Sequence, residues 1–123
     1  MFNLILRSGA PENTGTHEGI ETTATLVRGQ AVHIASGKAV AATGELPIYG
    51  IVTEEPINGV VTVLKVTPDM IFRCPASATA VKGTKVTLAA SAGGVTGTAV
   101  GSGKFGATIV EKMSGGFAEV RFE

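Results

Sequence analysis

The stretch LVRGQAVHI at residues 26–34 returns as AVKGTKVTL at residues 80–88, 54 positions further along the chain. Both stretches read as two apolar residues, a basic residue, a glycine, and then apolar residues alternating with others. Alternation with a period of two is typical of a β-strand with one buried face, and a glycine beside a basic residue is typical of a turn. The repeated stretch therefore predicts two copies of one turn-and-strand element.

The repeat continues downstream of these stretches. Two extra residues fall in the Gly-rich segment 91–103. That segment is predicted to be a long loop between strands, where an insertion is tolerated best. Three further matches follow at an offset of 56: YG at 49–50 with FG at 105–106, NG at 58–59 with SG at 114–115, and TVLKV at 62–66 with AEVRF at 118–122.

Each copy is expected to be a β-unit, which makes the protein all-β. The NG dipeptide at 58–59 is a hairpin signal, because both residue types tolerate positive φ. A glycine after an aromatic residue, as at Gly50 and Gly106, predicts a bulge or a close backbone approach. The internal repeat spans residues 25–66 and 79–123, and we expect its two β-units to form a small β-barrel or β-tulip-like sandwich.

The first 24 residues differ in character from the rest. Their apolar tip consists of Phe2, Leu4, Ile5 and Leu6. A polar run rich in Gly, Thr and Glu follows at 8–25, and such a run buries too little apolar surface to order itself. We therefore expect an extended N-terminal arm at 1–24 and a β-barrel domain at 25–123. The alternative is a first strand at 3–7 followed by a loop.

Composition argues against several classes of function. The 123 residues fit one domain. Ten Lys and Arg balance ten Asp and Glu, so neither a basic nucleic-acid binder nor an acidic tail is expected. No apolar run approaches the roughly 18 residues of a membrane helix, so no membrane partner is expected. A neutral protein with only 16% charged residues is suited to work within a larger assembly.

Groups that could carry out chemistry are scarce. His17, His33 and the single Cys74 lack the spacing of metal ligands. Glu54 and Glu55 are adjacent, and neighbouring strand positions point to opposite faces. The thiol is expected to be reduced and buried, since one cysteine cannot form an internal disulfide. No catalytic, cofactor-binding or metal-ligating residue is predicted, and the protein is not expected to be an enzyme.

Six segments share a pattern of glycines and strands over roughly residues 25–123. They are PIYGIV at 47–52, GVVTV at 59–63, TPDMIFRCP at 67–75, VKGTKV at 81–86, FGATIV at 105–110 and GFAEVRF at 116–122. Together they resemble the capsid decoration (cement, head-stabilising) proteins of tailed bacteriophages. The likeness is one of glycine and strand pattern and includes no catalytic motif.

The resemblance implies a small barrel or tulip-like module that is commonly a homotrimer. Such modules sit on the outside of the expanded capsid, at local three-fold points, and have no catalytic site. The implied partner is the major capsid protein, and the implied location is the capsid exterior of a virion assembled in the host cytoplasm. An N-terminal arm often contacts the shell in that family. The predicted contact residues are Phe2, Leu4, Ile5 and Leu6.

The arm prediction can be tested by deletion. If residues 1–15 form a detached arm, their deletion should leave a folded module that no longer binds capsids. The alternative function is a β-rich module that recognises carbohydrate or a host surface. Such a module needs aromatic side chains on an exposed flat face, and the one Tyr and five Phe of this protein mostly fit core positions.

Overall fold

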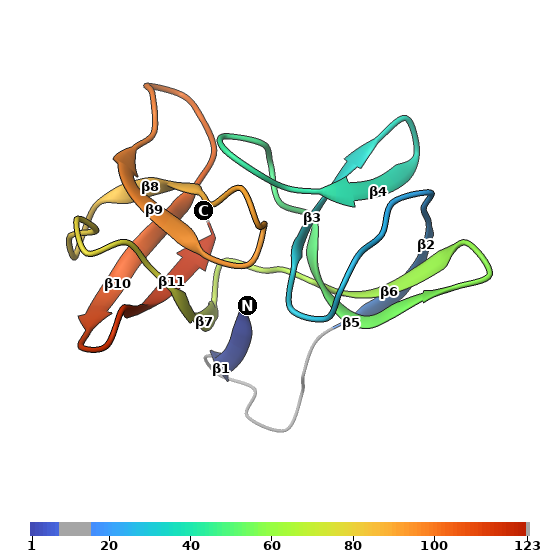
Figure 1. Ribbon diagram of the computed structural model, residues 1–123, viewed down its shortest axis with the longest axis horizontal. Coiled ribbons are helices and arrows are strands. Elements are labelled where there is room, and N and C mark those ends of the chain that lie inside the picture. Colours follow the sequence, from blue (N-terminus) through green and yellow to red (C-terminus); the bar gives the residue numbers. More distant parts are fainter. Residues whose placement is uncertain (8–15, 123) are drawn as a thin grey trace.

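The computed structural model describes residues 1–7 and 16–122, and over these residues the protein is all-β, with no helix. Figure 1 shows two sheets side by side along the long axis, with the N-terminal strand between them. The strands are β1 (Asn3–Arg7), β2 (His17–Glu21), β3 (Ala31–Ala35), β4 (Lys38–Ala41), β5 (Gly50–Ile57), β6 (Val60–Lys65), β7 (Met70–Pro75), β8 (Lys85–Leu88), β9 (Val95–Ala99), β10 (Ala107–Met113) and β11 (Phe117–Phe122).

Both sheets are antiparallel. One has six strands in the order β1-β7-β11-β10-β8-β9, and the other has five in the order β2-β6-β5-β3-β4. The prediction of an all-β fold is confirmed. Over the described residues neither ladder closes on itself, so the barrel form of the prediction is wrong, whereas the sandwich form is consistent with the two sheets.

The strand order is the same in the two sheets. Every strand of the five-stranded sheet has one counterpart in the six-stranded sheet. The order β2-β6-β5-β3-β4 corresponds strand by strand to the order β7-β11-β10-β8-β9. Strand β1 is the sixth strand and lies outside this correspondence, next to β7. The repeating structural unit therefore includes β2 and β7, which precede the segments that match in sequence.

Equivalent hydrogen bonds define the register of the two units. The Gly29 N–H donates to the Val52 carbonyl, and the Gly83 N–H donates to the Ile109 carbonyl, each at 2.8 Å. The glycines lie 54 positions apart, as in the sequence match, whereas the acceptors lie 57 apart. The hairpin match at an offset of 56 is therefore wrong by one residue. A slip of one residue exchanges the buried and exposed faces of a strand.

The hairpin turns show the same shift of one residue. Asn58 and Gly59 occupy the first turn with φ of 53° and 79°, and Gly115 and Gly116 occupy the second with φ of 82° and 84°. Ser114, which precedes the glycine pair, corresponds to Ile57, because both strands of the hairpin keep an offset of 57. The NG dipeptide corresponds in structure to GG rather than to SG, because both turns need two residues with positive φ.

The five-stranded sheet curls until its first and last strands nearly meet. The buried Thr22 hydroxyl, just after β2, donates to the Ala39 carbonyl of β4 at 2.7 Å and accepts from the Ala24 N–H at 3.0 Å. In the second unit the corresponding approach is a parallel bridge between Ala76 and Val95. Each unit is thus an almost closed curl whose gap is spanned by a few contacts, which in the second unit include the Ser77 N–H donating to the Val95 carbonyl at 3.3 Å.

Replacing Thr22 with Val should lower the free energy of unfolding by about 1–3 kcal/mol, because the buried Ala39 carbonyl and the Ala24 N–H lose their hydroxyl partner. Chemical denaturation measures the change. The control is Thr87→Val, whose half-buried hydroxyl contacts only the Thr96 hydroxyl and should cost no more than about 0.5 kcal/mol. Equal losses in the two variants would contradict the assigned role of Thr22.

Two hydrophobic clusters hold the sheets together. The larger one joins them, since it contains Ile51 and Leu64 from the five-stranded sheet with Phe72 and Val120 from the six-stranded sheet. The smaller one lies on the opposite face of the five-stranded sheet, within its curl. Its buried members are Leu26, Val32, Ala39, Val52, Val61 and Val63. The five-stranded sheet is therefore buried on both faces, whereas the six-stranded sheet buries one.

The start of the polypeptide is a strand of the body. Strand β1 pairs with β7 through Asn3↔Arg73 and Leu4↔Phe72, and β2 pairs with β6 along its whole length. The prediction of an extended arm at 1–24 is therefore wrong for its described residues, and the alternative of a first strand at 3–7 is confirmed. Residues 8–15 lie outside the described part. The physical reason is that the edge of β7 offers unpaired backbone groups, which an extended apolar segment satisfies.

The Gly-rich segment 91–103 also differs from its prediction. It contains β9, which pairs with β8 through Val86↔Ala99 and Leu88↔Val95. The β-branched residues among its glycines favour a strand. The close approaches predicted at Gly50 and Gly106 are confirmed, since an added Cβ would lie 2.6 Å and 2.4 Å from backbone oxygens.

Candidate interaction surface

The four predicted shell-contact residues do not share one surface. The Phe2 side chain is 2% exposed, and Leu4 is half-buried against the same cluster. Ile5 is 44% exposed, and the backbone of Leu6 pairs with Ile71. Because successive residues of a strand face opposite ways, a short apolar run in an edge strand divides its side chains between core and surface.

Phe2 is part of an aromatic cluster inside the protein. Its ring packs edge-on against Phe122 with centroids 5.1 Å apart, and the centroid of the Phe72 ring lies 5.3 Å from that of Phe122. The Phe2 N–H also donates to the Gly29 carbonyl at 2.8 Å. Phe2 can contact a partner only if β1 leaves the sheet. In this structure the Phe2 side chain is therefore part of the hydrophobic core.

Ile5 lies at a hollow on the outer face of the six-stranded sheet, with a volume of about 650 Å³. This hollow, hereafter the β1–β10 hollow, crosses β1, β7, β11 and β10 on the side away from the shared core. Its lining residues are Ile5, Pro68, Asp69, Ile71, Val110, Glu119 and Arg121.

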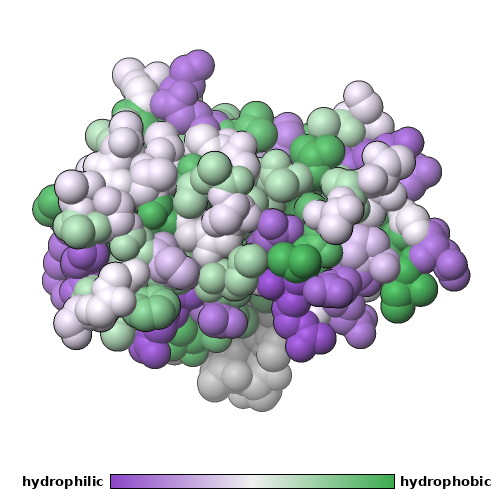
Figure 2. Space-filling view, viewed as in Figure 1, coloured by the Kyte–Doolittle hydropathy of each residue, from purple (hydrophilic) through white to green (hydrophobic). Residues whose placement is uncertain are grey.

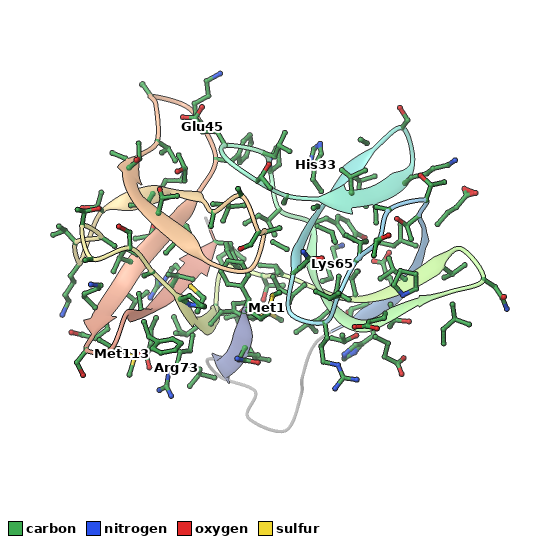
Figure 3. The ribbon with its side chains drawn as sticks, in the orientation of Figure 1. Met1, His33, Glu45, Lys65, Arg73 and Met113 are labelled. Atoms are coloured by element: carbon green, nitrogen blue, oxygen red, sulfur yellow. The ribbon has the colours of Figure 1, made fainter. Side chains whose placement is uncertain are left out.

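The β1–β10 hollow has an apolar centre and a charged rim. Ile5, Ile71 and Val110 supply the apolar surface. On the rim, the Arg73 guanidinium forms an ion pair with the Glu119 carboxylate at 3.1 Å. Figure 3 shows Arg73 and Met113 at the same end of this sheet, away from His33 and Lys65. An apolar centre within a polar rim is the usual composition of a protein-docking surface.

Several exposed apolar side chains lie away from the β1–β10 hollow, among them Leu46, Ile57 and Val81. Figure 2 shows green and purple residues interspersed over the face it displays. Exposed apolar side chains that occur singly are normal for a folded protein. A second apolar hollow, lined by Pro47, Ile48, Val66 and Phe105 among others, has a volume of about 220 Å³, so the β1–β10 hollow is the wider of the two.

Of these three apolar residues, only Ile5 was a predicted contact residue. Ile71 and Val110 were not predicted as contacts. The outward position of Ile71 could have been predicted from strand alternation. Met70, Phe72 and Cys74 are buried, which leaves Ile71 on the opposite face of β7. No comparable signal marks Val110, because the register of β10 shifts at that point between Ile109 and Glu111.

The groups considered for chemistry are dispersed over the fold. His17 lies exposed on β2, and His33 Nδ1 lies 3.0 Å from the Pro47 carbonyl. Glu54 and Glu55 lie exposed on β5. Within residues 1–7 and 16–122, no group of three or more His, Cys, Asp or Glu residues is placed to hold a metal ion.

Cys74 is a free thiol in the shared core, 1% exposed. Burial raises the pKa of this thiol from 9.0 to about 12. The thiol therefore stays protonated in the folded protein, whereas unfolding restores its ordinary pKa. The contribution of its burial to stability is complete below about pH 9 and is lost as the pH rises toward about 12.

A thiol-specific reagent should therefore fail to modify the native protein at neutral pH and should react fully after denaturation. The physical reason is that the thiolate is the reactive form and Cys74 is both protonated and enclosed. Mass spectrometry of treated samples measures the modified fraction. Rapid, complete labelling of the native protein would show that β7 is open to solvent.

The aromatic residues do not form one exposed platform. The Tyr49 hydroxyl donates to Glu18 at 2.5 Å, which raises the Tyr49 pKa, and the Lys65 ammonium lies 5.7 Å from the centre of the Tyr49 ring. Phe105 and Phe117 are exposed. They lie at opposite ends of the β10–β11 hairpin, roughly 25 Å apart at the rise of an extended strand.

Comparison of the sequence and the structure with protein-family models, with curated proteins and with solved structures returned no match. The residues that the structure describes also form no helix of the length and apolar character needed to cross a membrane.

Proposed function

We propose that this is a structural protein that binds the outer surface of a phage capsid and stabilises the expanded shell. The observation that carries the proposal is the β1–β10 hollow, where Ile5, Ile71 and Val110 present apolar surface inside a charged rim. A protein that binds only the assembled shell stabilises that shell by mass action, without any catalytic group.

Three further features support this proposal. The body is built from two copies of one β-unit joined by a shared core, which suits a rigid clamp. Its formal net charge is zero, which fits a protein whose working state is an assembly. The resemblance to capsid decoration proteins lies in the same strands and turns that build the two sheets. A homotrimer with one hollow per copy would gain affinity through effective concentration.

The test is binding of the full-length protein to expanded heads made from a candidate major capsid protein. Co-sedimentation should show saturable binding, and the decorated heads should resist heat or chelation longer than bare heads. Unexpanded heads are the control for the assembled surface. Absence of the protein from the pellet at saturating concentration, together with binding to a glycan array, would replace this proposal with carbohydrate recognition.

A further inference from the structure

The turn between β5 and β6 contains an asparagine whose side-chain amide is exposed to solvent. Asn58 and Gly59 are both exposed and both have positive φ. Among the described residues the Asn58 amide group and the Gly59 N–H have no hydrogen-bond partner, and the Gly59 carbonyl accepts from the Thr22 N–H at 2.8 Å. The Asn58 amide and the following backbone nitrogen are therefore open to water.

We propose that Asn58 is a site of spontaneous deamidation that alters the closure of the five-stranded sheet. The Gly59 nitrogen attacks Cγ of Asn58 and forms a new bond to it, while the bond between Cγ and Nδ2 of Asn58 breaks. The leaving Nδ2 takes the proton from the Gly59 nitrogen and departs as ammonia. Water then opens the five-membered succinimide at either carbonyl, which gives aspartate or isoaspartate.

The residue types favour this reaction at Asn58 over Asn3. Glycine has no Cβ, so it offers the least resistance when its nitrogen approaches the side group of the preceding residue. Asn3 precedes Leu4 within the paired strand β1, where the backbone is extended and the next residue is bulky. The turn must open briefly for ring closure, and hairpin tips open at low cost in free energy.

The two products have different effects on the fold. Aspartate keeps the backbone path and tolerates positive φ, so the turn survives with one more negative charge near Glu54 and Glu55. Isoaspartate adds a carbon to the backbone of a two-residue turn. The Gly59 carbonyl then moves away from the Thr22 N–H, and Thr22 is the residue that links β2 to β4.

Trypsin separates the sites for a direct test. Cleavage after Lys38 and Lys65 releases residues 39–65, in which Asn58 is the sole asparagine and no glutamine occurs. Asn3 falls in the peptide 1–7. The full-length protein is incubated at mildly alkaline pH and then digested. For each peptide, the increase in mass and the separation into aspartate and isoaspartate forms by chromatography are followed over time. We expect Asn58 to convert at least about tenfold faster than Asn3.

The second unit supplies the control. Asn58→Gly reproduces the Gly115–Gly116 turn, so this variant should fold normally and its 39–65 peptide should keep its mass. The Ala76 N–H donates to the Gly116 carbonyl at 2.8 Å, as the Thr22 N–H does to Gly59. In the isoaspartate fraction, hydrogen exchange at Thr22 should accelerate while exchange at Ala76 is unchanged.

Two results would overturn the proposal. One is an unmodified 39–65 peptide in the folded protein under conditions that convert the denatured protein, because the turn would then protect Asn58. The other is conversion to isoaspartate with unchanged exchange at Thr22, which would show that the turn does not hold the end of β2.

Discussion

Phe2→Ala is expected to destabilise the protein by about 3–5 kcal/mol, the usual cost of removing a buried phenylalanine ring. The Phe2 ring is 2% exposed and packs against Phe122, which in turn contacts Phe72. The cavity would open between the two sheets, where few neighbours can shift to fill it. For a protein of this size the melting temperature should fall by roughly 10–20 °C.

Thermal and denaturant unfolding of the variant measure this loss. Phe117→Ala is the matched control, because Phe117 is also an aromatic strand residue but is 43% exposed. It should cost no more than about 1 kcal/mol. A Phe2 variant as stable as the control would mean that β1 is not docked on β7 in solution.

Ile5→Asp is expected to weaken capsid binding by about thirtyfold or more, which is the range of a central interface residue. Ile5 is 44% exposed and lines the β1–β10 hollow, so a carboxylate there would have to be desolvated on docking. Its exposure also means that the substitution should leave the melting temperature nearly unchanged. Titration of expanded heads with the variant measures the affinity.

The control for Ile5→Asp is Ile57→Asp. Ile57 is 71% exposed at the end of β5, on the other sheet, so the same change of chemistry is made away from the hollow. Binding should be retained. If both variants bind like the unsubstituted protein, the outer face of the six-stranded sheet is not the docking surface, and capsid decoration would require another face.

These two substitutions replace the deletion that the sequence suggested. Removing residues 1–15 would remove Phe2 from the core together with Ile5 from the surface, so a loss of binding would follow from unfolding alone. Point substitutions separate the two roles, because Phe2 and Ile5 face opposite sides of the sheet.

The all-β class, the turn positions and the repeat could be predicted because each depends on local chemistry. Alternating β-branched residues predict a strand, and two adjacent residues that tolerate positive φ predict a hairpin turn. The sequence leaves the place of β1 open between an arm and a first strand, since an apolar run such as LIL at 4–6 fits the edge of its own sheet as well as a partner. Its own body provides that edge at β7, and the larger cluster accepts the Phe2 ring.

The β1–β10 hollow was harder to predict than the fold. Its residues come from β1, β7, β10 and β11, which are distant in sequence and meet only through the sheet order. The one-residue shift between Ile109 and Glu111 further conceals which residues of β10 point outward. A surface assembled from several strands depends on register, and register was the feature that the sequence match placed incorrectly.

The duplicated strand order has a consequence for the history of the protein. Two halves that keep the same hydrogen bonds at Gly29 and Gly83 descend most simply from one ancestral segment copied in tandem. Their residues have since diverged so far that the equivalent turn dipeptides, NG and GG, share only one residue. The two halves can thus be compared as homologues within one protein. Their differences show how many substitutions a β-unit tolerates while its architecture is kept.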